Sequence, residues 1–370
     1  MEYRNHAGNK VSALGFGCMR FPVTADGAVD EAEARRMLDR ALAAGVTYFD
    51  TAYPYHDGES ERVVGRWLAG KQRSSINLAT KLPIWLVNGP QDPPRLFAEQ
   101  LEKLQTDYID YYLLHALDAE RWETVLSSGA LELLTRLKAE GRIRHIGFSF
   151  HDEYPVFERI ATGFDWDFCQ LQLNYMDINE QAGRRGLALA AKRGMSVVVM
   201  EPVKGGYLAN PPREVRERFA ALRPQWSPSS WALRWVAGLP GVSVVLSGMS
   251  AMAQVEDNLS TFNSLQPLNS EENAAVEAAA ALYRARTAVP CTGCRYCMPC
   301  PAGVEIPDNF RLRNEAAIFD APEKARDRYA HMESGRADLC VKCRRCVALC
   351  PQHIDIPTHL AEAHAYFTAT

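Results

Sequence analysis

Residues 46–81 read VTYFDTAYPYHDGESERVVGRWLAGKQRSSINLATK. Two short apolar runs, Thr47–Asp50 and Leu78–Lys81, stand at the ends of this segment, with a longer polar and amphipathic stretch between them. Short runs of this kind are typical of buried parallel strands, and the stretch between them is long enough for a crossover helix. The segment therefore predicts one strand–helix–strand unit, and both of its strands end on a charged side chain.

The same alternation continues from residue 11 to about residue 250. Asp30–Ala44, Arg95–Leu104 and Leu131–Ala139 each carry apolar residues at spacings that form one face of a helix. An open doubly wound sheet is the main alternative, but Gly15–Gly17 lacks the third glycine of its usual phosphate loop. We therefore expect an α/β fold, a (β/α)₈ TIM barrel, since a barrel closes eight parallel strands without free edges. Its other strands are expected at Ala13–Gly17, Tyr111–His115, His145–Ser149, Cys169–Leu173, Val197–Met200 and Val244–Ser247.

Composition excludes several classes of protein. The 370 residues fit one large barrel with a small appendage, and 47% of them are hydrophobic, which is ordinary for a globular protein. A formal charge of -4 gives no reason to expect nucleic acid or an anionic membrane as a partner. No apolar run reaches the roughly 18 residues of a membrane helix. The polar start, MEYRNHAGNK, lacks the apolar core of a signal peptide, so we expect a cytoplasmic protein.

Cysteines divide the chain unevenly. Only Cys18 and Cys169 lie in the first 290 residues, where they read as small core residues, whereas eight cysteines fall between Cys291 and Cys350. Clustered thiols in a reducing compartment favour metal binding. We place the domain boundary near residue 287, with a barrel over 1–287 that includes a connector helix, and a second domain over 288–370.

The second domain carries two cysteine motifs. The later one, Cys-x-x-Cys-x-x-Cys-x-x-x-Cys-Pro, is the bacterial ferredoxin run, whose fourth cysteine ligates the other cluster. The earlier one is a residue shorter before its last cysteine, and paired cysteines of this kind also form zinc sites. We expect a small α-helical ferredoxin-like domain with two [4Fe–4S] clusters. The expected ligands are Cys291, Cys294, Cys297 and Cys350 for one cluster, and Cys340, Cys343, Cys346 and Cys300 for the other.

The barrel's reactive groups lie where strands end. Asp50, Lys81, His115 and Ser149 each close an apolar run, and Tyr55 follows the first of them by five residues. In barrels the functional side chains gather at the C-terminal ends of the strands. A single charged strand end is usually only the place where the chain meets water. Titratable ends on three consecutive strands are rarer, and they predict one shared pocket.

These residues resemble the aldo-keto reductase family over roughly residues 1–265. The resemblance rests on FDTAYPYHDGESERVVGRWL, on Lys81, on LLH at His115 and on GFS at Ser149. It implies an NAD(P)H-dependent enzyme that reduces an aldehyde or ketone, or runs in reverse on an alcohol. The implied catalytic residues are Asp50, Tyr55, Lys81 and His115. Tyr55 would be the general acid, made more acidic by the Lys81 ammonium, while Asp50 orients Lys81 and His115 hydrogen-bonds the substrate oxygen.

The resemblance also implies cofactor contacts. Ser149 and Gln170 would bind the nicotinamide carboxamide, Gly205 and Gly206 the pyrophosphate, and Asp257 and Asn258 the adenine. Many NADPH-preferring members carry Lys and Arg where this chain has Gly248 and Gln254. Because those charges clamp the 2′-phosphate, we expect NADH to be used at least as well as NADPH.

Three roles for the clusters remain open at this level. They are structural, they connect a flavoprotein or ferredoxin partner to the protein, or they sense oxidation. The alternative to a reductase is a redox-responsive, nicotinamide-binding partner protein, or a subunit of a ferredoxin-linked complex, with little carbonyl turnover. The loops Leu82–Pro94, with Trp85, and Ala116–Gly129, with Trp122, are expected to wall the pocket, and their apolar content predicts a partly hydrophobic carbonyl substrate. A tryptophan in such a loop is equally well explained as a packing residue.

Overall fold

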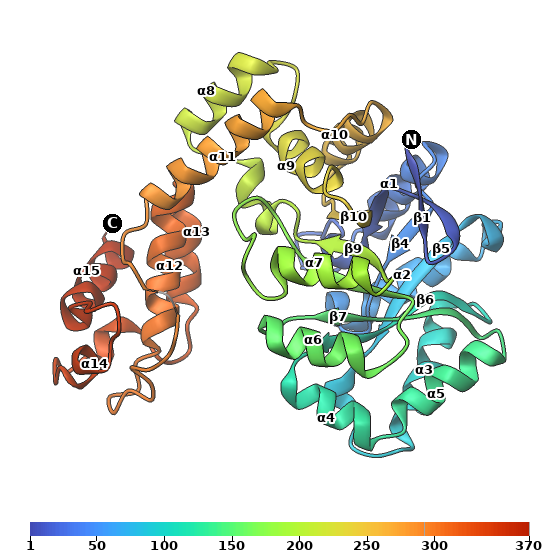
Figure 1. Cartoon of the computed structure of the whole chain (residues 1–370), viewed down its shortest axis with the longest axis horizontal. Helices are drawn as coiled ribbons and strands as arrows, with labels where there is room; N and C mark the ends of the chain where they lie inside the picture. Colours follow the sequence, from blue (N-terminus) through green and yellow to red (C-terminus); the bar gives the residue numbers. More distant parts are fainter. Residues whose placement is uncertain (292, 370) are drawn as a thin grey trace. The chain divides into compact units, whose positions relative to one another are not determined.

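Eight parallel strands close into a barrel in the computed structural model, which describes residues 1–291 and 293–369 (Figure 1). The strands follow one another round the barrel in chain order, and the last pairs with the first. The (β/α)₈ barrel expected from the sequence is confirmed. The barrel strands are β3 (Leu14–Gly17), β4 (Tyr48–Asp50), β5 (Asn77–Leu82), β6 (Ile109–Leu117), β7 (Ile143–Phe150), β8 (Phe168–Gln172), β9 (Ser196–Met200) and β10 (Val242–Gly248).

Helices follow the strands as the periodicity predicts. The first helix begins after Asp30, whose side chain accepts a hydrogen bond from the Glu33 amide at 3.0 Å and so caps it. Within the described ranges, no helix is long and apolar enough to span a membrane. The helices that precede residue 270 are α1 (Glu31–Ala43), α2 (Glu59–Leu68), α3 (Asp92–Leu104), α4 (Ala119–Ser127), α5 (Ala130–Ala139), α6 (Tyr154–Gly163), α7 (Gly183–Lys192), α8 (Arg213–Leu222), α9 (Pro228–Ala237) and α10 (Met252–Asn263).

A hairpin that the sequence analysis did not foresee precedes the barrel. β1 (Tyr3–His6) and β2 (Asn9–Ser12) pair antiparallel. Arg4 donates to the Val242 carbonyl at 2.9 Å, and His6 hydrogen-bonds the Ser243 hydroxyl at 2.7 Å. Because Val242 and Ser243 begin the last barrel strand, the hairpin lies at the N-terminal end of the barrel. The opposite end is left for the loops that follow the strands.

The chain forms two compact units, and their boundary is not a single point in the sequence. The first unit comprises residues 1–206 and 225–273, and the second comprises 207–224 and 274–370. The segment that contains α8 therefore packs with the C-terminal part of the chain. The helices of that part are α11 (Ser270–Ala285), α12 (Ile306–Phe319), α13 (Pro322–Ala330), α14 (Arg345–Ala348) and α15 (Ile356–Thr368).

The second unit has its own core. Buried Val304, Phe310 and Leu360 belong to one hydrophobic cluster that draws on α12, α13 and α15. Six of the eight clustered cysteines pack against this core from its edge. The expected α-helical, ferredoxin-like domain is confirmed.

Candidate functional site

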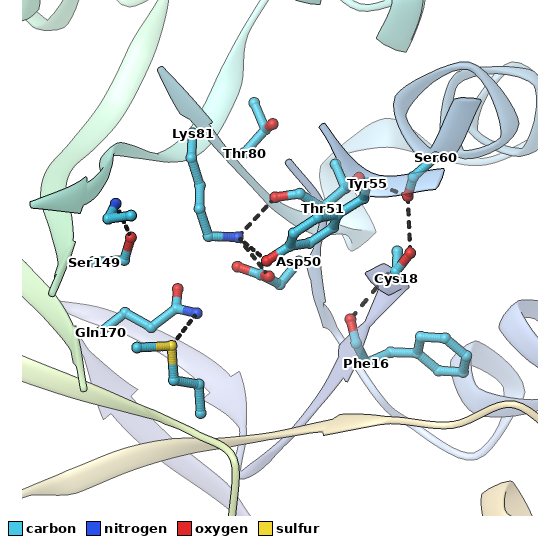
Figure 2. A network of polar contacts seen from close by, with 12 residues as sticks. Phe16, Cys18, Asp50, Thr51, Tyr55, Ser60, Thr80, Lys81, Ser149 and Gln170 are labelled. Carbon is cyan, nitrogen blue, oxygen red and sulfur yellow. Dashed lines mark hydrogen bonds and ion pairs between the residues drawn. The ribbon is translucent and has the colours of Figure 1, made fainter. Parts of the chain in front are cut away.

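Lys81 is the centre of the polar contacts at the C-terminal end of the barrel (Figure 2). It lies near the end of β5 and is 1% exposed. Its ammonium donates to Asp50 Oδ1 at 2.7 Å, to the Thr51 carbonyl at 2.8 Å and to the Tyr55 hydroxyl at 3.3 Å. The structure thus brings together three of the four expected catalytic residues, and it adds the Thr51 carbonyl, which the sequence did not indicate.

Two hydrogen-bond networks hold the loops around Lys81. Ser60, at the start of α2, hydrogen-bonds the Thr51 hydroxyl at 2.8 Å and donates to the Cys18 carbonyl at 2.9 Å. Behind β5, the Gln100 amide donates to Glu61 at 2.6 Å and to the Lys81 carbonyl at 3.0 Å. These contacts fix α2, which directly follows the Tyr55 loop, against the strand that carries Lys81.

The electrostatics favour a protonated Tyr55 beside a charged Lys81. Burial lowers the pKa of Lys81, but the Asp50 and Tyr55 charges outweigh burial and leave its pKa raised. For Tyr55, burial raises the pKa; Lys81 lowers it, and Asp50 raises it again. Lys81 thus lowers the pKa of Tyr55 as expected, but burial outweighs this effect and the net shift of the pKa is upward. The phenol keeps its proton at neutral pH.

The imidazole of His115, near the end of β6, is neutral. Burial lowers its pKa well below the usual value, and the charges of Lys81 and Arg121 lower it further. Its ring lies 6.1 Å from the Tyr55 ring and 5.0 Å from the Trp85 ring, measured between centroids. Its buried Nδ1 has no hydrogen-bond partner among the described residues. A neutral imidazole here is able to donate one hydrogen bond to a substrate oxygen.

Only one of the two tryptophans lies at the site. Trp85 is 42% exposed beside His115, as a pocket wall requires. Trp122 is 2% exposed and packs against Trp166 at 6.2 Å and against Gly163. Of the two alternatives for a tryptophan in these loops, Trp122 is therefore a packing residue, because its helix turns that side chain toward α6.

Ser149 and Gln170, the residues expected to bind nicotinamide, lie in the adjacent strands β7 and β8. Ser149, in β7, accepts a hydrogen bond from the Ala116 amide at 2.7 Å, and its own hydroxyl proton remains to donate. Gln170, in β8, is 2% exposed, and its Oε1 has no hydrogen-bond partner among the described residues. Its amide nitrogen reaches only the Met200 sulfur at 3.7 Å. A buried amide with unused donors and acceptor fits a carboxamide ligand, since such groups are costly to leave unpaired.

The glycines expected at the pyrophosphate lie in left-handed backbone. Gly205 has φ 61° and Gly206 has φ 94°, in the turn after β9. Gly248 ends β10, and a Cβ there would lie 3.2 Å from Cδ of Arg20; one on Gly205 would lie 3.7 Å from its Nη2. Arg20 therefore lies beside both Gly205 and Gly248. The sequence analysis did not identify this residue. The sequence feature that could have pointed to Arg20 is a single charged residue three positions after the first barrel strand, β3.

The expected adenine residues have structural partners. The Asp257 carboxylate accepts from the Ser227 hydroxyl at 2.6 Å, and Asn258, 4% exposed, donates to the Ser247 hydroxyl at 2.8 Å. Gln254 accepts from the Ser250 amide at 2.8 Å. These bonds fix the start of α10 beside β10, so the segment is preorganised.

Four cysteines line one hollow of the second unit. Cys291, Cys294, Cys297 and Cys350 surround it together with apolar residues of α12 and the chain before α15. Burial raises the pKa of Cys291, and the nearby Cys294 and Cys350 raise it further. This is the set expected for one cluster, and it unites the first motif with the last cysteine of the second.

The other four cysteines also lie near one another. Burial raises the pKa of Cys346, and the neighbours that raise it further are Cys340, Cys300 and Cys343. Among residues 1–291 and 293–369, no three Cys, His, Asp or Glu side chains are placed to hold one single metal ion. Eight thiols, six of them packed against an apolar core and Cys294 and Cys343 exposed, fit the donors and surroundings of iron–sulfur clusters.

Comparison with known families assigns both units. A model described as "Aldo/keto reductase family" matches residues 13–281, and one described as "4Fe-4S dicluster domain" matches residues 290–354. The second match begins just before Cys291 and spans all eight clustered cysteines.

Individual relatives agree with the first match. The chain is 25% identical over 299 residues to the uncharacterized oxidoreductase YqkF of Bacillus subtilis, covering 72% of this chain and 92% of that one. It is 26% identical over 272 residues to the NADH-specific methylglyoxal reductase of Escherichia coli, covering 61% and 82%. The holo structure of aldo-keto reductase AKR11C1 from Bacillus halodurans superposes with a TM-score of 0.61 at 29% identity, over 75% of this chain and 96% of that one.

The buried ion pair between Asp50 and Lys81 leads to a prediction about the stability of the protein. Asp50→Asn leaves the Lys81 ammonium without its charged partner, so we expect the free energy of unfolding to fall by about 3 to 5 kcal/mol. The double variant Asp50→Asn/Lys81→Met should be more stable than Asp50→Asn alone. Urea unfolding followed by circular dichroism measures both. Glu140→Gln removes an exposed ion pair with Arg136 and serves as control, with a change of about 0.5 kcal/mol or less. Equal losses for Asp50→Asn and Glu140→Gln would contradict the prediction.

Proposed function

Because the chain belongs to the aldo/keto reductase family and carries a 4Fe-4S dicluster domain, we propose that this oxidoreductase reduces an aldehyde or ketone with NAD(P)H. The observation that carries the proposal is the Lys81 ammonium 3.3 Å from the Tyr55 hydroxyl, with neutral His115 beside them. A proton donor and a second hydrogen-bond donor then meet where a carbonyl oxygen would enter.

Each of these side chains has a definite task. Tyr55 holds its proton until negative charge develops on the carbonyl oxygen, and it then donates that proton. Once Tyr55 has donated its proton, Lys81 stabilises the resulting Tyr55 phenolate, because its ammonium is already within hydrogen-bond distance. Asp50 and the Thr51 carbonyl keep the ammonium charged and fixed. His115 donates a hydrogen bond that orients the same oxygen.

The cofactor contacts follow the strand ends. When bound, the reduced nicotinamide supplies the hydride. Gln170 offers an unpaired buried oxygen and two amide protons to its carboxamide, and Ser149 offers its hydroxyl proton. Gly205 and Gly206 allow a close backbone approach to the pyrophosphate. Arg20 places its guanidinium beside Gly205, where it would meet the pyrophosphate that NADH and NADPH share.

For the second unit we propose two [4Fe–4S] clusters, which supply one-electron chemistry or rigidity when bound. The two sets of four cysteines support this assignment, since each set joins three cysteines of one motif to the last cysteine of the other. Cys300 is among the thiols that raise the pKa of Cys346, which supports its place in the second set despite the short spacing before it.

Tyr55→Phe tests the reductase proposal. Without the phenolic proton, kcat for reduction of a carbonyl panel should fall by about 10²- to 10⁴-fold, while NAD(P)H still binds. The panel should contain methylglyoxal, the compound in the name of the E. coli relative. Steady-state loss of nicotinamide absorbance measures the rate. Tyr53→Phe is the matched control, because the Tyr53 hydroxyl points to Glu99 and not to Lys81. Full activity in Tyr55→Phe would refute this role and favour a nicotinamide-binding partner protein.

Cofactor preference can be measured on the wild-type protein. Gly248 and Gln254 leave the α10 segment without the cations that would clamp a 2′-phosphate, so kcat/KM for NADH should equal or exceed that for NADPH. Both constants are obtained with one carbonyl substrate at the same ionic strength. A preference for NADPH of about a hundredfold, or about 3 kcal/mol, would mean that another cation serves the 2′-phosphate.

Iron content tests the cluster assignment. Anaerobically reconstituted protein should hold about eight irons per chain, and Cys300→Ala should hold about four, because only one set loses a ligand. Iron analysis and electron paramagnetic resonance after reduction give both numbers. Cys169→Ala removes a buried barrel cysteine and should keep about eight irons. Stoichiometric zinc in place of iron, or an unchanged iron content in Cys300→Ala, would contradict the assignment.

A further inference from the structure

The strand that carries His115 contains a bulge next to that residue. Leu114 pairs with β7 in one register and Leu117 in another, so that His115 and Ala116 stand opposite the single residue Ser149. Ala116 has φ 55°, which is unfavourable for a residue with a Cβ. Bulges of this kind re-aim a side chain at many functional sites, and they need contacts that hold them in place.

Ser149 and Arg121 hold the bulge from its two sides. The Ala116 amide donates to the Ser149 hydroxyl at 2.7 Å, and the Ala116 carbonyl accepts from Arg121 Nη1 at 2.8 Å. Arg121 lies in the first turn of α4, which follows this strand directly. Its guanidinium is therefore fixed to the backbone of the residue that comes next after His115.

The hydrogen bonds of Arg121 leave one edge of its guanidinium free. Besides Ala116, Nη1 contacts only Asp118 Oδ2, at 2.8 Å, while Asp118 Oδ1 accepts a hydrogen bond from the Arg121 amide. Within residues 1–291 and 293–369, Nε and Nη2 meet no acceptor. Their N–H groups form a planar fork that matches the two oxygens of a carboxylate. The side chain is 35% exposed, so a ligand can reach this fork.

Trp85 connects the guanidinium to the proposed catalytic residues. Cζ of Arg121 lies 5.8 Å from the centroid of the Trp85 ring, and that ring lies 5.0 Å from the His115 ring. Trp85 is exposed in the turn after β5. A substrate whose carbonyl oxygen contacts His115 and whose body lies along Trp85 brings its other end to Arg121.

The charges around His115 favour an anion at that end. Burial lowers the pKa of His115 most, and the positive charges of Lys81 and Arg121 lower it further. Asp50 and Asp118 each bond one of these cations, yet both cations still act on the imidazole. A negative charge on the substrate is stabilised by such surroundings. One guanidinium balances a carboxylate, which carries a single charge.

We propose that Arg121 is a specificity-determining residue, and that the substrate is a carbonyl compound with a carboxylate at its other end. The fork of Arg121 binds the carboxylate, while Tyr55 and His115 contact the carbonyl oxygen. The carboxylate takes no part in the reaction: the hydride reaches the carbonyl carbon, the Tyr55 proton reaches its oxygen, and the product is a hydroxy acid. The inference rests on the proposed reductase function and names its substrate class.

Matched pairs of acid and methyl ester test this substrate class. The acids are glyoxylate, succinic semialdehyde and 4-formylbenzoate, which differ in the distance between carbonyl and carboxylate. In the wild type, kcat/KM for the acid should exceed that for its ester about tenfold or more in at least one pair, because the ester loses a charge-assisted contact. Loss of nicotinamide absorbance, at saturating nicotinamide, measures each rate.

Arg121→Met separates recognition of the carboxylate from support of the bulge. Without the guanidinium, the ratio of kcat/KM for acid over ester should fall about tenfold in the preferred pair. A residue that only held the bulge would slow acid and ester equally and leave that ratio unchanged. Arg136→Met is the matched control, since Arg136 is an exposed arginine of α5 that lies near Glu140. It should keep the wild-type ratio.

Salt gives a second measurement that needs no variant and stands if Arg121→Met fails to fold. Because salt screens a partly exposed charge pair, kcat/KM for the preferred acid should fall about threefold or more between about 0.05 and 0.5 M NaCl. The value for its ester should change much less, since the ester is neutral.

Three results would overturn the inference: no acid preferred over its ester in the wild type, an acid-to-ester ratio that persists in Arg121→Met, or equal salt dependence of acid and ester. Reduction of methylglyoxal, which carries no charge, would leave the reductase function standing in each of these cases. A wild type that reduces no carbonyl compound with NADH or NADPH would instead refute the proposed function, and the substrate class with it.

Discussion

A buried ammonium is the constraint on which the barrel's site depends. An ion the size of Lys81 Nζ is stable out of water only when its protons are paired and its charge is balanced. Asp50, the Thr51 carbonyl and Tyr55 supply those partners from a neighbouring strand and the loop after it. The fold therefore has to bring the end of β4 and the Tyr55 loop within hydrogen-bonding distance of the Lys81 ammonium at the end of β5.

The surrounding structure meets that requirement by close packing. A Cβ on Gly65 of α2 would lie 2.1 Å from the Lys103 carbonyl of α3, so only glycine allows the two helices to approach as they do. Glu61 and Gln100 then reach each other from these helices and bond the strand that carries Lys81. A buried polar network of this kind is costly when broken, which gives the Tyr55 loop one well-defined position.

The local pattern of the sequence predicts the barrel and its strand ends well, and it predicts long-range assembly poorly. The length and spacing of the apolar runs indicated each barrel strand. The reactive groups could then be expected in one pocket, because the C-terminal ends of the strands share one face of the barrel. β1 and β2 were missed because four-residue polar strands give almost no periodic signal. The packing of 207–224 with the C-terminal unit and the place of Arg20 are contacts between distant residues. The net pKa of Tyr55 depends on burial, which no motif reports.

The two chemistries proposed for this chain differ in the number of electrons that they move. Hydride transfer moves two electrons together, whereas an iron–sulfur cluster moves one, and the chain shows no sequence signature of a flavin site to convert between them.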